Sequence, residues 1–280
     1  MNTDRITLLL ILCLAITACV TTKNSKTSNT PDFISFKEAD DMLFKDADAR
    51  KWREVFHDPL TGNWKQQWTL DGEVATAVTG SEGIDLTAGK ERKDSDHMVL
   101  WTKDEFEGDV KIEYEFTRLD TVSGGGVNIL YIQATGSGQQ PYKKDIAKWA
   151  ELRREPAMKL YYDRMNTYHI SYSAYPNNES TTDDYIRARR YMPHKTGLKD
   201  SDLKPDYFKS GFFQSGVPHK FTVIKKDRDI YMRISNAQQT SYFHWHNDKL
   251  PIITEGRIGL RLMWTRASRF KNFKVSVPRK

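Results

Sequence analysis

Residues 110–117 read VKIEYEFT, and their apolar side chains fall at every second position. Such alternation is typical of a β strand that buries one face and exposes the other. The same period recurs along the chain in GVNILYIQAT at 126–135, NTYHISYSAY at 166–175, DYIRARRY at 184–191, HKFTVIKKD at 219–227, DIYMRIS at 229–235, RIGLRLMW at 257–264 and FKNFKVSV at 270–277. We therefore predict that the body of the chain is all-β.

Turn residues separate these strands, among them the glycines at 124–126 and the pair Glu255-Gly256. Parallel strands need long crossover connections, usually helices, and the sequence has one candidate helical insertion at residues 144–154. A further short helix is expected within residues 33–52. The sequence thus predicts an antiparallel two-sheet sandwich with a short N-terminal helical segment.

The N-terminus has the features of an export signal. The apolar run ITLLLILCLA is too short to span a bilayer, and small residues follow it before Cys19. This pattern resembles the lipobox of bacterial lipoproteins, with an ordinary secretory signal as the alternative. We expect a signal peptide at 1–18, a lipid on Cys19, a flexible tether at 19–33 and one jelly-roll domain at 34–280. Val20 and the lack of a following aspartate resemble lipoproteins that are sorted to the outer membrane.

Charge and cysteine content narrow the choice of partners. The formal net charge is +6, but Lys and Arg are interleaved with Asp and Glu, which argues against a nucleic-acid partner. For an exported protein, the excess charge suits an acidic polysaccharide or simply a solvated surface. Both cysteines, Cys13 and Cys19, belong to the leader or its end, so the body has no thiol for a disulfide or a metal. No metal site or cofactor is predicted, and the sequence leaves open whether a structural calcium ion is bound.

Residues 97–277 also carry a family resemblance, over about two thirds of the chain. The segments HMVLWTKDEFEGDVKIEYEF, GGGVNILYIQATG, NTYHISYSAY, GVPHKFTVIKKDRDIYMRISN and GRIGLRLMWTRASRFKNFKVS resemble the concanavalin-like jelly rolls of bacterial polysaccharide-utilisation systems. More narrowly, they are similar to the YesU-like family. The resemblance implies sugar substrates that often bear uronates, and similarity to ulvan-oligosaccharide-processing lyases and dehydratases implies elimination chemistry.

A polar stripe marks the segment 166–175. The residues His169, Ser171, Ser173 and Tyr175 share one strand face, opposite a core-like set. A polar stripe on a central strand suits the floor of a sugar-binding groove. His169 is the candidate general base because its ordinary pKa lies near neutral pH, and Tyr175 is the candidate proton donor. A structural histidine is the alternative.

Arginines form a second set of candidates. Arg187 and Arg189 share a strand face with tyrosines, and a guanidinium matches the geometry of carboxylate or sulfate. A solvated edge strand is the alternative. Arg261 shares a face with Gly259, which would leave room for a ligand beside it. Weaker candidates for substrate binding are Asn128, Tyr131 and Trp101.

Histidine, tyrosine and arginine suit elimination on a uronate better than hydrolysis. Elimination needs a group that neutralises the carboxylate, a base and an acid. The Glu-x-Asp-x-x-Glu strand motif of jelly-roll retaining glycosidases is missing from the sequence. Together with the family resemblance, this predicts a lyase or dehydratase, and the resemblance implies uronate-containing, ulvan-like poly- or oligosaccharides as its substrates. A non-catalytic surface glycan-binding lipoprotein is the main alternative, and a glycoside hydrolase is the third.

Overall fold

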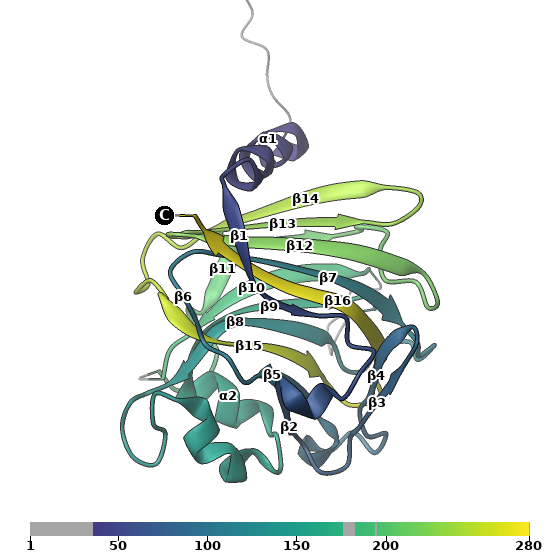
Figure 1. Ribbon diagram of the computed structural model, residues 1–280, viewed down its shortest axis with the longest axis vertical. Helices are drawn as coiled ribbons and strands as arrows, with labels where there is room; N and C mark the ends of the chain where they lie inside the picture. Colours follow the sequence, from purple (N-terminus) through teal and green to yellow (C-terminus); the bar gives the residue numbers. More distant parts are fainter. Residues whose placement is uncertain (1–35, 176–182, 194, 280) are drawn as a thin grey trace, which may run out of the picture. The chain divides into compact units, whose positions relative to one another are not determined.

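The computed structural model describes residues 36–175, 183–193 and 195–279. Two antiparallel sheets of eight strands each form a sandwich (Figure 1). Sheet 1 has the order β14-β13-β12-β7-β16-β4-β3, and β1 also pairs with β16. Sheet 2 has the order β11-β10-β9-β8-β15-β5-β2, and β6 also pairs with β15. The predicted all-β sandwich is therefore confirmed.

The strands of sheet 1 are β1 (Trp52–Asp58), β3 (Thr76–Gly80), β4 (Gly83–Thr87), β7 (Val110–Arg118), β12 (Pro218–Lys226), β13 (Asp229–Ser235), β14 (Thr240–His246) and β16 (Ala267–Pro278). The strands of sheet 2 are β2 (Trp68–Asp71), β5 (Met98–Thr102), β6 (Phe106–Glu107), β8 (Asn128–Gly136), β9 (Met165–Ser173), β10 (Tyr185–Tyr191), β11 (Asp202–Phe208) and β15 (Glu255–Leu262). Each recurrent period-2 segment of the sequence overlaps one of these strands.

Helical structure is confined to short segments. Helix α1 lies within the predicted range and packs Phe44 and Ala47 against Ile224 and Tyr231 of sheet 1. The predicted insertion continues past residue 154, because α2 follows η3. The helices are α1 (Phe36–Asp48), η1 (Trp64–Gln66), η2 (Asp94–Asp96), η3 (Ile146–Arg153) and α2 (Met158–Arg164).

The main hydrophobic core lies between the two sheets. Ile112 and Tyr114 of β7 meet Leu130 of β8 and Ile170 of β9 in one buried cluster. Their sequence neighbours on each strand point the other way, as the strand period requires. Burial of this cluster removes large apolar side chains from water, which is the main driving force for folding.

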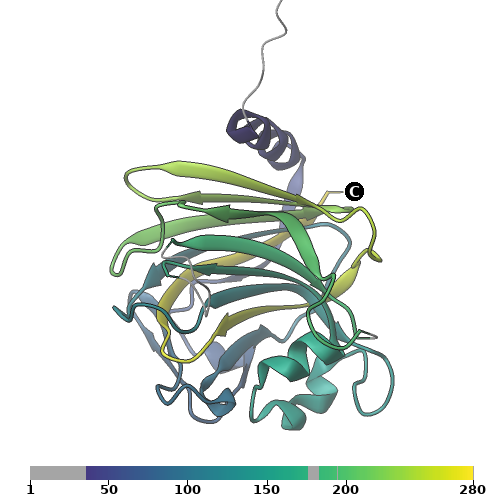
Figure 2. The same ribbon diagram turned by 180° about the vertical axis from the view of Figure 1, so that it is seen from behind.

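The outer face of sheet 2 is also covered. Ile129 and Tyr131 of β8 belong to a second buried cluster, together with Ile146, Trp149 and Tyr161 of the helical insertion. Segment η3 lies close to strand β8, and helix α2 lies close to strands β9 and β10. Figure 2 shows the insertion from behind, relative to the view of Figure 1. The insertion therefore forms a roof over part of this face.

Within the described ranges, no helix is long and apolar enough to cross a membrane. The same residues contain no group of three or more His, Cys, Asp or Glu side chains arranged to hold a metal ion. The predicted signal peptide, Cys19 and the tether lie outside the described residues.

Candidate functional site

Two neighbouring rows of residues cross the outer face of sheet 2. In row 1, the strand register pairs Arg189 of β10 with His169 of β9, and His169 with Tyr131 of β8. Tyr131 is paired in turn with Gly259 of β15, and Gly259 with Trp101 of β5. Because directly paired residues point to the same face of a sheet, the register brings these predicted residues together.

Row 2 runs beside row 1. It pairs Arg187 of β10 with Ser171 of β9, and Ser171 with Ile129 of β8. It continues from Ile129 to Arg261 of β15, and from Arg261 to Val99 of β5. The register therefore places Arg187, Arg189 and Arg261 on the same face of the sheet as His169.

Asp71, at the end of β2, fastens the helical insertion over these rows. Its Oδ2 accepts hydrogen bonds from Trp101 Nε1 at 2.7 Å, Arg153 Nε at 2.6 Å and the Tyr161 hydroxyl at 2.8 Å. The Asp71 and Arg153 side chains are only 3% and 2% exposed. A charged pair in such a site holds its partners firmly, because neither charge is stable there alone.

The expected open space beside Arg261 is occupied. A Cβ atom at Gly259 would lie 2.5 Å from the Trp101 ring, so the indole fills the room that the glycine leaves. The roof also contacts Arg261, whose Nη2 donates to the Pro156 carbonyl at 2.7 Å and whose Cζ lies 4.3 Å from the Tyr161 ring centroid. The expectation of ligand room at Gly259 is therefore wrong, because the glycine serves close packing of Trp101.

At the centre of the face, Tyr131, His169, Tyr191 and Arg261 form what we call the central cluster. The Tyr191 hydroxyl, both His169 ring nitrogens, and Nε and Nη1 of Arg261 are buried without a close hydrogen-bond partner among the described residues. The Tyr131 hydroxyl interacts with the Arg261 guanidinium, but the two groups lie outside close hydrogen-bond geometry. The His169 ring centroid lies 4.9 Å from that of Tyr191 and 5.8 Å from that of Tyr131. An unpartnered buried polar atom costs about 1–3 kcal/mol, so such a concentration calls for a functional reason.

Burial sets the protonation states of this cluster. Burial, together with the positive charges of Arg189, Arg261 and Arg187, holds the pKa of His169 well below its ordinary value. Burial raises the pKa of Tyr131 to about 12 and the pKa of Tyr191 well above its ordinary value. At neutral pH the cluster therefore offers a neutral imidazole, two phenol donors and a guanidinium.

The other two arginines already have carboxylate partners on β11. Arg187 Nε lies 3.0 Å from Asp206 Oδ2, and Arg189 Nε lies 2.7 Å from Asp202 Oδ1. Their side chains are 13% and 18% exposed, so they lie at the margin of the face. These ion pairs reduce the positive charge that an acidic ligand would meet at the margin.

The structure does not bring Tyr175 or Asn128 to the central cluster. Strand β9 ends at Ser173, four residues or about 13 Å from His169, and Tyr175 lies beyond that end. Tyr175 is therefore too far from His169 to serve as the proton donor of the predicted acid–base pair. Asn128 faces the inside of the sandwich, where its Oδ1 accepts a hydrogen bond from Ser268 Oγ at 3.0 Å.

Sequence reasoning missed the residues that close the site. Asp71, Arg153 and Tyr161 are far apart in the sequence, and no periodic pattern links them. Tyr191 was predicted on the same strand face as Arg187 and Arg189, as a ring for packing against a sugar and not as a hydrogen-bond donor. The sequence signal for a hydrogen-bonding role was its position on the same strand face as Arg189. That signal is weak, because a tyrosine on such a face is equally suited to packing.

Comparison with known proteins places the chain in a family. The model of the family described as Domain of unknown function (DUF1961) matches residues 54–275. The chain belongs to the DUF1961 family. The matched part of this DUF1961 protein contains both rows, Asp71 and the whole helical insertion. No curated protein matches the chain significantly.

Solved structures support the fold of this DUF1961 domain. A Bacillus subtilis protein of unknown function with a galectin-like fold is 18% identical, with a TM-score of 0.61 over 82% of this chain and 100% of that chain. The exoplasmic/lumenal domain of VIP36, bound to Ca²⁺ and Man3GlcNAc, is 13% identical, with a TM-score of 0.53 over 80% and 89%. The Emp46p carbohydrate recognition domain, in its metal-free form, is 15% identical, with a TM-score of 0.52 over 80% and 97%. These likenesses show a lectin-like sandwich.

We expect acid to destabilise this DUF1961 protein. Burial lowers the pKa of His97 to about 2, of His219 to about 4, and of His169 well below its ordinary value. The unfolded chain binds a proton at each histidine below about pH 6.5 and the folded chain does not, so stability is lost as the pH falls. Each histidine should cost about 1.4 kcal/mol at pH 5.5.

Urea unfolding at pH 7.5 and pH 5.5 checks this expectation. Replacing His219 with glutamine should reduce the loss between the two pH values by the contribution of one histidine. The matched control is His57→Gln, because the His57 side chain is 42% exposed. Equal free energies of unfolding at the two pH values in the unmodified protein would contradict the expectation.

Proposed function

We propose that this protein binds an acidic carbohydrate at the central cluster and catalyses elimination at its uronate. The observation that carries the proposal is the set of unpartnered polar atoms on Tyr131, His169, Tyr191 and Arg261. A sugar carboxylate could accept hydrogen bonds from the guanidinium, and sugar hydroxyls could pair with the phenols and the imidazole. The lectin-like fold and the mannose-containing ligand of VIP36 support a carbohydrate as the ligand.

Elimination would use three members of the cluster. Arg261 would neutralise the uronate carboxylate and so acidify the hydrogen on the neighbouring carbon. A His169 nitrogen would take that proton, and the electrons of the C–H bond would form the carbon–carbon double bond. The oxygen on the next carbon would leave with the C–O electrons and receive a proton from Tyr191 or Tyr131. These tyrosines replace Tyr175 in the role of proton donor.

The cover over the site favours short substrates. Tyr131 and Arg261 are 0% exposed, and His169 is 1% exposed. A ligand group must displace part of this cover, which is easier for the end of a chain than for the middle of a polymer. We therefore favour an oligosaccharide dehydratase or end-acting lyase, with ulvan-like uronate glycans as the substrate class. Attachment to the outer membrane through Cys19 would place the enzyme in the cell envelope.

One observation favours the alternative of a glycan-binding protein without catalysis. The pKa of His169 lies well below its ordinary value because of burial and the neighbouring arginines. A lower pKa makes the imidazole a weaker base. Under this alternative, the same cluster would bind the acidic sugar with no bond broken.

The binding step is tested by removing single hydroxyls. Tyr131→Phe and Tyr191→Phe each delete only a hydroxyl that has no close hydrogen-bond partner among the described residues. We expect unchanged or increased stability, because the substitution removes a buried polar atom that lacks a close hydrogen-bond partner. Affinity for an acidic oligosaccharide, measured by titration calorimetry, should fall about fivefold to a hundredfold, as for a lost hydrogen bond of about 1–3 kcal/mol.

Tyr161→Phe is the matched control. Its hydroxyl donates to Asp71 at 2.8 Å, so its loss should reduce stability. Wild-type affinity in both Tyr131→Phe and Tyr191→Phe would remove these hydroxyls from the site.

A further inference from the structure

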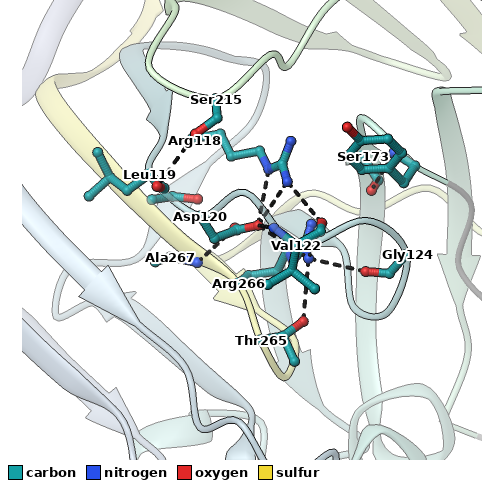
Figure 3. Close-up of polar contacts among 12 residues, drawn as sticks. Arg118, Leu119, Asp120, Val122, Gly124, Ser173, Ser215, Thr265, Arg266 and Ala267 are labelled. Carbon is teal, nitrogen blue, oxygen red and sulfur yellow. Dashed lines mark hydrogen bonds and ion pairs between the residues drawn. The ribbon is translucent and has the colours of Figure 1, made fainter.

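A second concentration of positive charge lies away from the central cluster, where β7 ends. Arg118 and Arg266 are only 3% and 1% exposed. Both contact the same carboxylate oxygen, Asp120 Oδ1, at 2.9 Å and 3.2 Å. Figure 3 shows the two arginines on either side of Asp120 and the neighbouring loop. Among the described residues, no second carboxylate contacts either guanidinium, so two buried positive charges share one negative charge.

The local backbone takes up part of the hydrogen-bonding capacity. Arg118 Nη2 and Arg266 Nη2 both donate to the Val122 carbonyl, at 2.9 Å and 3.0 Å. Arg266 Nη2 also lies 3.1 Å from the Gly124 carbonyl. These bonds hold the loop, but carbonyl groups do not cancel a net charge. Since an uncompensated buried charge is costly, the arrangement favours an additional anion.

Arg266 keeps a donor free for such an anion. Its Nε is buried and has no hydrogen-bond partner among the described residues. Burial lowers the pKa of Arg266, the Asp120 carboxylate opposes this decrease, and the positive charges of Arg118 and Arg92 add to it. The effect of these two arginines is the opposite of that of a nearby carboxylate.

An aromatic ring stands beside the pair. The Tyr175 ring centroid lies 5.1 Å from Arg118 Cζ, and the side chain is partly exposed. Ser173, at the end of β9, lies to the right of Arg118 in Figure 3, and its Oγ accepts a hydrogen bond from the Tyr175 backbone N–H at 3.2 Å. A half-exposed tyrosine next to an arginine can pack against the CH face of a sugar ring whose acidic group meets the guanidinium.

We propose that Arg118, Arg266 and Tyr175 form a second binding site, for an acidic sugar carrying a carboxylate or a sulfate ester. The site is distinct from the central cluster, because the end of β9 is about 13 Å from His169. A few sugar rings can span that separation, so a second acidic residue of the same glycan is a suitable ligand. The site gives Tyr175 a binding role in place of the catalytic one.

Titration calorimetry at constant ionic strength tests the site with D-glucuronate, D-glucose 6-sulfate and neutral D-glucose. We expect at least one acidic sugar to bind ten times more tightly than glucose. Arg266→Lys and Arg118→Lys keep the charge but lose the planar fork of donors, and each should weaken that binding at least tenfold. The matched control Arg269→Lys changes a partly exposed arginine paired with Asp85 and should have no effect. Preference for glucuronate or for the sulfate ester identifies the oxyanion.

Two further variants keep the outcome decisive. Tyr175→Leu removes a partly exposed ring and should fold normally. It should weaken the same binding at least threefold, so it tests the site even if an arginine variant fails to fold. Tyr191→Phe alters only the central cluster and should leave the Arg266-dependent binding intact, so failure of one site is distinguishable from failure of the other. Equal binding of glucose and both acidic sugars, or wild-type affinity in the folded arginine and Tyr175 variants, would overturn the proposal.

Discussion

Replacing His169 with glutamine is expected to lower turnover on a uronate-bearing oligosaccharide by about 10²–10⁴-fold, the usual worth of general acid–base catalysis. The side chain is buried between Tyr131 and Tyr191, and both of its nitrogens lack partners among the described residues. Glutamine has a similar size and retains a donor and an acceptor, but it cannot take a proton at these pH values. The loss should therefore appear in kcat more than in affinity.

Initial rates and calorimetric affinity, measured on the same preparation, separate the two effects. His246→Gln is the matched control, because this histidine is 51% exposed and lies on sheet 1. A folded His169→Gln protein with wild-type turnover would exclude His169 as the base. A fall in activity that follows only the loss of folded protein would indicate a structural histidine instead.

Replacing Asp71 with asparagine should lower the free energy of unfolding by about 3–5 kcal/mol, the usual cost of removing one partner of a buried ion pair. The change leaves the Arg153 charge in a nearly dry site, where its side chain is 2% exposed. It also weakens the hydrogen bonds from Trp101 and Tyr161. Because these contacts fasten the insertion over the central cluster, substrate affinity should change together with stability.

Chemical denaturation of the Asp71→Asn protein measures the loss. Asp85→Asn provides the comparison, because Asp85 pairs with Arg269 at a site where both side chains are 36% exposed. Exposed ion pairs contribute about 0–1 kcal/mol, so this second change should be nearly neutral. Equal, small effects of the two substitutions would show that Asp71 does not hold the insertion.

Much of the fold could be predicted from the sequence, because strand parity is a local property. The alternation in residues 110–117 and in the related segments placed the core between the sheets correctly. The predicted segments did not include the strands β1 to β6, β11 and β14. In β11, for example, DLKPDYF contains a proline and has no clear alternation. Helix α2 lies wholly beyond the predicted insertion and was missed, because its seven residues are too few to show a helical period.

The candidate site was predictable only in part. The period-2 alternation correctly assigned His169, Arg187 and Arg261 to the face of their strands that points away from the main core. It carries no information about what covers that face. The ion pairs of Arg187 and Arg189 depend on β11, and the burial of Arg261 depends on contacts with Pro156 and on a roof fastened to Asp71. These are long-range contacts between segments without a shared pattern, so a single sequence does not reveal them.

The most direct test of the proposed elimination is ultraviolet absorbance during incubation with uronate oligosaccharides. Elimination creates a double bond conjugated to the carboxyl group, whereas binding and hydrolysis do not. We predict a growing absorbance with the wild-type protein and a rate reduced by about 10²–10⁴ in His169→Gln. Tight binding of the same oligosaccharides with no new chromophore would contradict catalysis and leave a glycan-binding protein.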